Sequence, residues 1–273
     1  MKTTLSLVAL CLLVACTTAS SCPGFSYSGG STGPTVWGSL CPEYATCKTG
    51  ENQSPVNFKL NNIEDVEDNV FDFTYRRAKD VDVTNANHII TATNNAESSF
   101  YFANDDFADY FDLKSVEVHT PSEHTIDGKA LDAEIQFIHE SEDGRVAIIS
   151  YLVKEGGSCD LLKELEADLP EEGETTTIDS LTPITPSSTY FLHYTGSLTS
   201  PPCTENVEWF VQEESISCSS SQISKISKAA GKSARPVVSL KDRTVTRAVV
   251  SGASVLSSSL FVGLALALLC VLF

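Results

Sequence analysis

The chain has 273 residues, enough for one sizeable domain with a substantial core. It is acidic, with 36 Asp and Glu against 18 Lys and Arg and a net charge of −18. A surface this negative repels phosphate backbones and sulfated polysaccharides, so we expect neither nucleic acid nor sulfated glycans as partners.

The first 19 residues predict a secretory signal peptide. Lys2 supplies the positive charge, LSLVALCLLVAC the apolar stretch, and Thr17 and Ala19 fit a small-residue cleavage site. The segment LVAC also resembles a bacterial lipoprotein box ending at Cys16, an alternative against which the C-terminus argues. We expect the mature chain to begin near Ser20 and to leave the cytosol.

The body of the chain is rich in strand signals. Residues 22–50, rich in Gly, Ser and Pro, predict an extended N-terminal arm with Tyr27 and Trp37 as aromatic anchors. From Val56 to about Val153, short β-branched and aromatic runs alternate with turn residues, which is typical of a largely antiparallel sheet. Further strands are expected at STYFLHYTGSLTS and VEWFVQEE.

Two helices are expected beside these strands. CDLLKELEADL, residues 159–169, places its leucines on one helical face, and ISKISKAAGK, residues 223–232, is the second candidate. EEGETTTID, residues 171–179, is expected to be a solvated loop. The pattern indicates a mainly β domain with few helices.

The C-terminal segment, residues 248–273, is expected to attach the domain to a membrane. Its apolar run 260–273 is short for a membrane span, and no charged residue follows it. Small residues upstream indicate a glycosylphosphatidylinositol (GPI) attachment signal, whose tail is discarded. A plain C-terminal anchor counted from Ala248 is the alternative. Either places the domain, residues 20–247, on the outer face of the plasma membrane. The candidate attachment residues are Ser251, Gly252 and Ala253.

Cysteine usage agrees with an extracellular location. Six of the nine cysteines remain once the signal peptide and the tail are removed, and an even number in a secreted domain predicts disulfides. Their spacing leaves the connectivity open. The six are Cys22, Cys41, Cys47, Cys159, Cys203 and Cys218.

Seven segments, in order, resemble the α-type carbonic anhydrases over roughly residues 25–246. They are YSGGSTGPTVWGSLCPEY, ENQSPVNF, NANH, LKSVEVHTPSEHTIDGK, AEIQFIH, YTGSLTSPPCTENVEW and ARPVVSLKDRTV. The resemblance implies a mainly β (α+β) fold, with a large twisted, mostly antiparallel sheet, peripheral helices and a conical pocket. It also implies a Cys47–Cys203 disulfide, which would pin the loop that carries Thr199.

The resemblance identifies the positions of a metal tripod. The family holds zinc with two histidines at alternate positions of one strand, which share a face, and a third on the neighbouring strand. The fourth coordination position holds a water whose pKa zinc lowers to about 7, and the resulting hydroxide attacks carbon dioxide. Here the tripod positions hold Glu117, His119 and Gln136, so two of the three ligands differ.

These replacements predict a weak metal site. The Glu117 carboxylate can bind zinc but cancels one positive charge, which raises the pKa of a bound water. The amide oxygen of Gln136 is a hard donor that suits calcium or magnesium better. Ser115 stands where a glutamine usually orients the first ligand, whereas Glu134, which orients the third, is kept. The expected cofactor is none or weakly bound zinc.

Other family positions are retained. Glu123 and Thr199 match the carboxylate and hydroxyl that align the zinc hydroxide, and His88 matches the proton shuttle. Each also has a structural interpretation, in which Glu123 and Thr199 satisfy one another and His88 is solvated. His119 alone is interpreted as a core histidine.

His124 and His139 match positions outside the tripod and are interpreted as structural hydrogen-bonding residues. A shifted tripod of His119 with His124 or His139 is the alternative, but Pro121 intervenes and alternation places His139 opposite Gln136.

The sequence therefore predicts an acatalytic recognition module with an unknown extracellular partner. The alternative is a working carbonate dehydratase that uses Glu117, His119 and Gln136. A third hypothesis is a cell-surface adhesin or receptor, whose partner would be basic or neutral because the chain is acidic.

Overall fold

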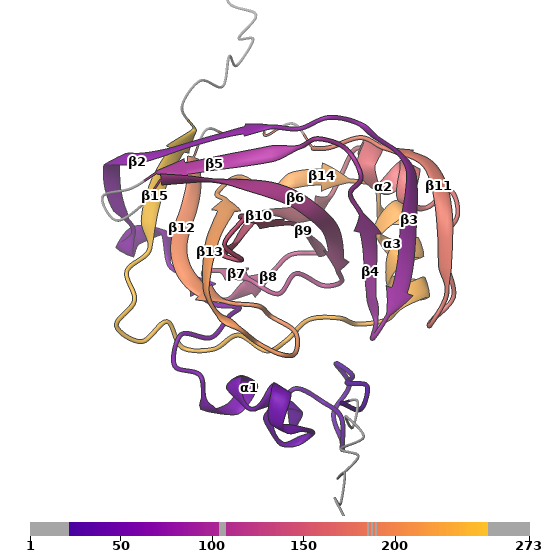
Figure 1. Ribbon diagram of the computed structural model, residues 1–273, viewed down its shortest axis with the longest axis horizontal. Coiled ribbons are helices and arrows are strands. Elements are labelled where there is room, and N and C mark those ends of the chain that lie inside the picture. Colours follow the sequence, from indigo (N-terminus) through magenta and orange to yellow (C-terminus); the bar gives the residue numbers. More distant parts are fainter. Residues whose placement is uncertain (1–21, 104–107, 185, 187, 189, 251–273) are drawn as a thin grey trace, which may run out of the picture.

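The computed structural model describes residues 22–103, 108–184, 186, 188 and 190–250. Most of its strands belong to one large sheet, with short helices outside it, and β1, β7 and β8 form a small separate sheet (Figure 1). The elements in chain order are η1 Trp37–Ser39, η2 Pro42–Tyr44, α1 Thr46–Thr49, β1 Asn57–Phe58, η3 Leu60–Asn62, β2 Glu64–Thr74, β3 Ala78–Ala86, β4 Ile89–Thr93, β5 Ser99–Ala103, β6 Ala108–His119, β7 Thr125–Ile126, β8 Lys129–Ala130, β9 Ala133–Glu140, β10 Val146–Glu155, α2 Asp160–Leu165, β11 Thr175–Leu181, β12 Tyr190–Ser197, β13 Glu205–Gln212, β14 Ile216–Cys218, α3 Ser220–Ala230 and β15 Thr246–Val250.

The large sheet branches at β6. On one side β6 pairs with β4 and β5, and on the other side with β9. From β5 the pairing continues through β2, β15, β12, β13 and β10 back to β9, so these strands and β6 close a ring (Figure 1). Among the described residues its pairings are antiparallel except β10–β13, β10–β14 and β15–β2. The expected large, twisted, mostly antiparallel sheet is confirmed.

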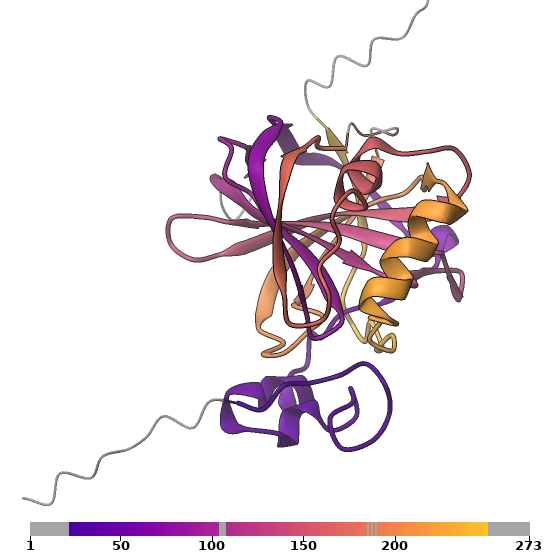
Figure 2. The same cartoon turned by 90° about the vertical axis from the view of Figure 1, so that its right-hand side faces the viewer.

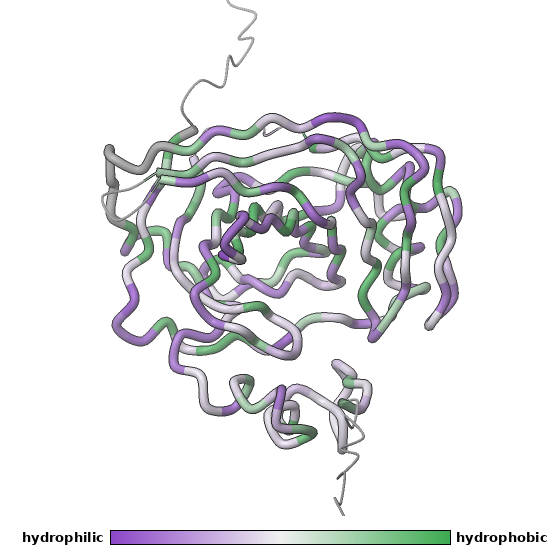
Figure 3. The backbone as a smooth tube through the Cα atoms, viewed as in Figure 1, coloured by the Kyte–Doolittle hydropathy of each residue, from purple (hydrophilic) through white to green (hydrophobic). Residues whose placement is uncertain are grey.

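Alternating hydropathy explains why these segments form strands around a core. Hydrophobic and hydrophilic residues alternate along strands such as β3 and β6, which bury one face, whereas β9 and β10 are buried on both faces (Figure 3). A cluster of phenylalanines fills the main core, and a second core gathers around Trp209 and Tyr194. Burying each such side chain contributes about 1.5–3 kcal/mol. The phenylalanines of the main core are Phe71, Phe100, Phe102, Phe111, Phe137, Phe191 and Phe210.

Both expected helices exist, with different bounds. α2 ends at Leu165, four residues before the expected end, and buries three leucines in the core. α3 begins at Ser220, three residues earlier than expected, because the Ser219 side chain caps the Gln222 backbone N–H. Figure 2 shows α3 and α2 on the same side of the sheet, where they cover its outer face.

Two expectations about local structure are wrong. Residues 171–179 are not a loop throughout, because β11 begins at Thr175 and pairs with β3 at the edge of the sheet. The N-terminal arm is not extended, because it folds into η1, η2 and α1. The Trp37 indole N–H donates to the carbonyls of Ser26 and Thr32, each at 3.0 Å, and this pulls the arm back on itself. The resulting lobe lies at one end of the molecule (Figure 2).

Three disulfides tie the chain together. They are Cys22–Cys41, Cys47–Cys203 and Cys159–Cys218. The second is the pair implied by the resemblance, and it joins the N-terminal lobe to the segment after β12. Disulfides are typical of oxidising compartments, so they indicate a secreted or extracellular protein.

The domain extends beyond the boundary expected at residue 247. β15 continues to Val250, and Ala248 is fully buried opposite Phe191 of β12. Ala248, from which the alternative anchor is counted, therefore belongs to the sheet. None of the helices in the described ranges is long and apolar enough to cross a bilayer. The proposed signal peptide, 1–19, and the candidate attachment residues lie outside the described residues. The candidate attachment residues are Ser251, Gly252 and Ala253.

Candidate functional site

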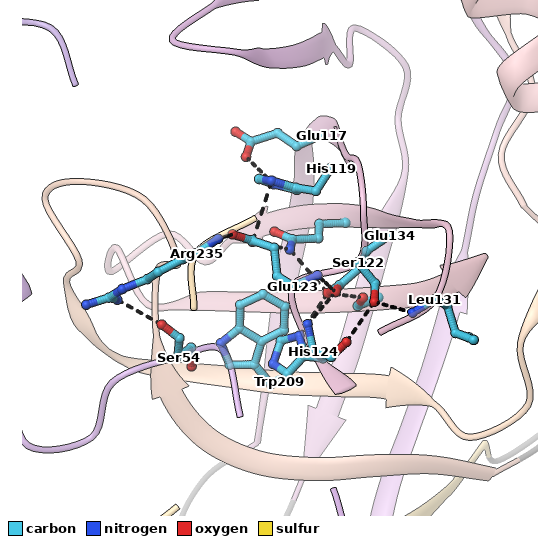
Figure 4. Close-up of polar contacts among 12 residues, drawn as sticks. Ser54, Glu117, His119, Ser122, Glu123, His124, Leu131, Glu134, Trp209 and Arg235 are labelled. Atoms are coloured by element: carbon cyan, nitrogen blue, oxygen red, sulfur yellow. Dashed lines mark hydrogen bonds and ion pairs between the residues drawn. The ribbon is translucent and has the colours of Figure 1, made fainter. Parts of the chain in front are cut away.

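The three tripod positions lie together on neighbouring strands. β6 carries Glu117 and His119 at alternate positions, so both side chains project from the same face. β9 pairs with β6 in a register that sets Gln136 opposite Glu117 and Glu134 opposite His119. Strand pairing thus assembles residues from two separate motifs into one buried polar site (Figure 4).

His119 is fully buried and held in one orientation. Its Nδ1–H donates to the Ser233 carbonyl at 2.7 Å, whereas Nε2 has no hydrogen-bond partner. Glu117 Oε2 lies 3.7 Å from Nε2, and Glu123 Oε2 lies 3.6 Å from Nδ1. Burial alone would lower the pKa of His119, but the two carboxylates and the Ser233 carbonyl outweigh it and raise this pKa to about 9.

Gln136 joins two buried carboxylates. Its amide nitrogen donates to Glu123 Oε2 at 3.0 Å and to Glu134 Oε1 at 3.2 Å. An ionised carboxylate can accept hydrogen bonds but cannot donate them, so the NH₂ end of the amide must face the two carboxylates. The amide oxygen then points away and makes no hydrogen bond within the described residues.

Glu134 is the centre of this network. Its Oε2 accepts the backbone N–H groups of Glu123 and His124 at 2.9 and 2.8 Å. Its Oε1 accepts His124 Nδ1–H at 2.8 Å and the Ser150 hydroxyl at 2.7 Å. Burial would raise the pKa of Glu134, but His124 and these donors lower it to about 2, so the group is anionic. His124 Nε2 accepts from the Tyr194 hydroxyl at 2.6 Å, which gives His124 the structural role that the sequence predicts.

Thr199 and Glu123 do not form the expected pair. Glu123 Oε1 accepts the Arg235 backbone N–H at 2.9 Å, and its Oε2 is bound by Gln136. No hydrogen bond joins Thr199 to Glu123 in the described part of the chain. Thr199 is nevertheless buried on the segment that the Cys203 disulfide pins.

His88 is attached to the end of a helix. It occupies the turn between β3 and β4 with a φ of 68°, and its Nδ1–H donates to the Ala230 carbonyl at the end of α3 at 2.9 Å. Its backbone N–H approaches Glu172 Oε2 at 3.3 Å. The interpretation of His88 as a solvated side chain is therefore wrong, since the ring is half-buried and tethered. Among the described residues, no hydrogen bond joins His88 to a tripod position.

Ser115 and His139 both stand apart from the tripod. Ser115 lies two residues before Glu117 on β6, but no hydrogen bond connects these side chains within the described ranges. His139 faces the aromatic core, where its Nδ1–H donates to the Ala147 carbonyl at 3.2 Å and its Nε2 accepts from the Tyr75 hydroxyl at 3.0 Å. Neither a shifted tripod with His139 nor one with His124 forms.

Sequence reasoning missed three residues of the site. Tyr27 lies edge-on to His119 with ring centroids 6.3 Å apart, and its hydroxyl is buried without a partner. Ser233 orients His119, and Arg235 contributes its backbone N–H while its guanidinium lies 5.6 Å from the Trp37 ring. These residues are about 90–120 positions from His119, so no local spacing could reveal them.

The donors do not fit the three-histidine zinc centre that the resemblance implies. Glu117 Oε2 and His119 Nε2 are close enough to share an ion, since two donors about 2 Å from a tetrahedral ion lie about 3.4 Å apart. Gln136, however, can offer only its amide oxygen. One imidazole, one carboxylate and one amide oxygen form a harder donor set than zinc prefers.

One other group of donors gathers among the described residues. Cys22, Cys41 and Glu43 have side-chain donor atoms close enough to share an ion. The two cysteines are joined by a disulfide, so they offer no thiolate to a metal. This cluster is therefore not an alternative metal site.

Comparisons with known proteins agree with this geometry. The family model described as eukaryotic-type carbonic anhydrase matches residues 32–249. A carbonic anhydrase of Nostoc sp. is 31% identical over 226 residues, which cover 81% of this chain and 84% of the relative. Dioscorin DB3L of Dioscorea polystachya is 31% identical over 240 residues, which cover 81% and 85%.

Solved structures show the same similarity. The α-carbonic anhydrase of Thermovibrio ammonificans in complex with the inhibitor sulfanilamide superimposes with a TM-score of 0.74 at 32% identity. The match covers 81% of this chain and 98% of that one. The sheet, the order of the motifs and the match of the family model over most of the chain lead to one conclusion. The chain belongs to the eukaryotic-type carbonic anhydrase family.

Proposed function

We propose that this protein is an extracellular binding module on the carbonic anhydrase fold, attached to the outer face of the plasma membrane by its C-terminal segment, and not a carbon dioxide hydratase. One observation carries the proposal. Of the three tripod positions only His119 presents an imidazole nitrogen, and the Gln136 amide nitrogen is engaged by Glu123 and Glu134.

The physical reason is the charge and hardness of the donor set. Hydration of carbon dioxide in this family needs a strongly charged zinc ion to acidify its bound water. Glu117 would cancel part of that charge, and Gln136 contributes a weak oxygen donor. Such a set neither holds zinc tightly nor leaves it the charge that this chemistry requires.

Stopped-flow measurement of carbon dioxide hydration, with metal analysis of protein purified without chelators, tests the proposal. We expect a rate close to the uncatalysed one and much less than one zinc per chain. A carbonic anhydrase of known hydratase activity, measured in the same assay, is the positive control. A sulfonamide-sensitive rate near that of the control, with one zinc per chain, would exclude the proposal.

The second candidate function is carbonate dehydration at a Glu117–His119–Gln136 metal site. It is favoured by His119, whose Nδ1–H is fixed by the Ser233 carbonyl while Nε2 stays buried and unpartnered, the arrangement of a metal-binding imidazole. Several relatives are also named carbonic anhydrases. Stoichiometric metal together with hydratase activity would favour this candidate.

The module would recognise a partner outside the cell, as an adhesin or receptor does. The net charge of −18 favours a basic or neutral partner over a sulfated glycan or a nucleic acid. The GPI attachment residues remain a proposal based on the small side chains before the apolar tail. They are Ser251, Gly252 and Ala253.

A further inference from the structure

A cavity of about 520 Å³ lies outside the candidate site, between residues 57–63 and residues 238–245. We name it the cationic groove. Three cationic and four apolar side chains line it, and the remaining lining residues are polar. The seven are Lys59, Lys241, Arg243, Ile63, Val238, Leu240 and Val245.

The groove is positive in a negative protein. Three cations and no carboxylate line it, although the chain carries a net charge of −18. Within the described residues, Lys59, Lys241 and Arg243 take part in no ion pair. Their charge is therefore available to an anion in the groove.

Arg243 makes the wall of the groove rigid. Its guanidinium donates to the carbonyls of Gln53 at 2.8 Å, Leu240 at 3.1 Å and Thr195 at 3.1 Å. It also lies 5.5 Å from the Tyr194 ring. Carbonyl dipoles orient this charge but do not neutralise it, and they hold the loop in a preformed shape.

The apolar side chains that line the groove belong to the second core or pack against it. Val245 is buried in the second core, and Ile63 and Leu240 pack against the same core. A ligand in the groove would therefore meet apolar side chains as well as the exposed side chains of Lys59 and Lys241. Ligand pockets commonly combine an apolar lining with a few placed polar groups in volumes of about 300–1,000 Å³.

We propose that the cationic groove binds a small organic anion, in which a sulfonate, carboxylate or phosphate group is joined to an apolar body. The site is independent of the tripod and of the function proposed above. Lys59 and Lys241 attract the anionic group, whereas the Ile63, Leu240 and Val245 side chains receive the apolar body.

A fluorescence titration with 1-anilinonaphthalene-8-sulfonate tests the proposal on the purified chain. We expect saturable binding at one site, and binding about tenfold weaker in the Lys59→Gln/Lys241→Gln variant because two attractive charges are lost. The matched control is Lys114→Gln/Lys228→Gln, which makes the same charge change at two other surface cavities. It should leave the affinity unchanged.

Two further measurements do not depend on these variants. Neutral N-phenyl-1-naphthylamine should bind about tenfold more weakly than the sulfonate. Sodium chloride should also weaken sulfonate binding, since exposed charges are screened by salt. The proposal is overturned by non-saturable binding, by equal loss of affinity in both double variants, or by equal affinity for the neutral compound.

Discussion

At the scale of single residues, Gln136 changes the site most. A histidine at this position would present one ring N–H and one lone pair, whereas the amide presents two N–H groups to two carboxylates. Gln136 therefore satisfies Glu123 and Glu134 without a metal. In the described part of the chain Glu123 accepts from Gln136 and from the Arg235 backbone N–H, and no hydrogen bond joins it to Thr199.

Restoring both histidines should restore zinc binding. We expect the Glu117→His/Gln136→His variant to purify with close to one zinc per chain, since three imidazoles would then face one point. Ser115→Gln alone is the control and should bind no more zinc than the unaltered chain. If the double variant folds but stays free of zinc, the replaced donors are not the reason for the weak site.

At the scale of elements, α3 links several parts of the candidate site. Its last carbonyl holds the His88 ring, and the Ala229 carbonyl accepts from the buried Asn85 side chain at 3.0 Å. The segment that follows α3 carries Ser233 and Arg235 to the tripod. The helix position therefore decides where these distant groups lie.

Loss of the α3 cap should destabilise this arrangement. Ser219 accepts the Gln222 backbone N–H, and the Gln222 side chain accepts the Ser219 backbone N–H. We expect Ser219→Ala to lower the free energy of unfolding by about 1 kcal/mol in urea denaturation. Ser221→Ala, exposed within the helix, is the matched control and should leave stability unchanged or slightly raised. Equal effects of the two substitutions would contradict the cap.

At the scale of the whole molecule, buried titratable groups tie stability to pH. Burial, only partly offset by the Ala147 carbonyl, lowers the pKa of His139 to about 4. The unfolded chain therefore binds the extra proton between pH 6.5 and 4, so stability falls as pH falls through this window. Glu134, with its pKa lowered to about 2, adds a loss below pH 4.5. His119 has the opposite effect on stability. Because its pKa is raised to about 9 in the folded chain, the stability that it contributes is lost as pH rises from 6.5 toward 9.

The His139 contribution can be isolated. Between pH 6.5 and 4 we expect it to remove about 3 kcal/mol of stability in the unaltered chain. In His139→Gln the uncharged side chain still accepts from the Tyr75 hydroxyl, so unfolding free energy measured in urea should depend less on pH in this window. Parallel pH profiles for the two proteins would contradict this assignment.

Much of the fold could be predicted from local patterns. Alternating hydropathy predicts the strands, and spacing of two places Glu117 and His119 on one face. The β11 edge strand was missed because its sequence is polar, and the folded N-terminal lobe because its sequence is rich in Gly and Ser. Pairing with β3 and the Trp37 hydrogen bonds to the Ser26 and Thr32 carbonyls override those local signals.

By itself the sequence determined the sheet and the family, because these depend on residue identity and on periodicity along the chain. The substitution of two tripod histidines stays a prediction from the resemblance. Only the tertiary structure decided the partners of each side chain. Gln136 bridges two carboxylates, His88 is tied to α3, and Arg243 shapes a cationic groove. Hydrogen bonds between residues far apart in the chain depend on how strands and loops meet in space, and no spacing along the sequence encodes them.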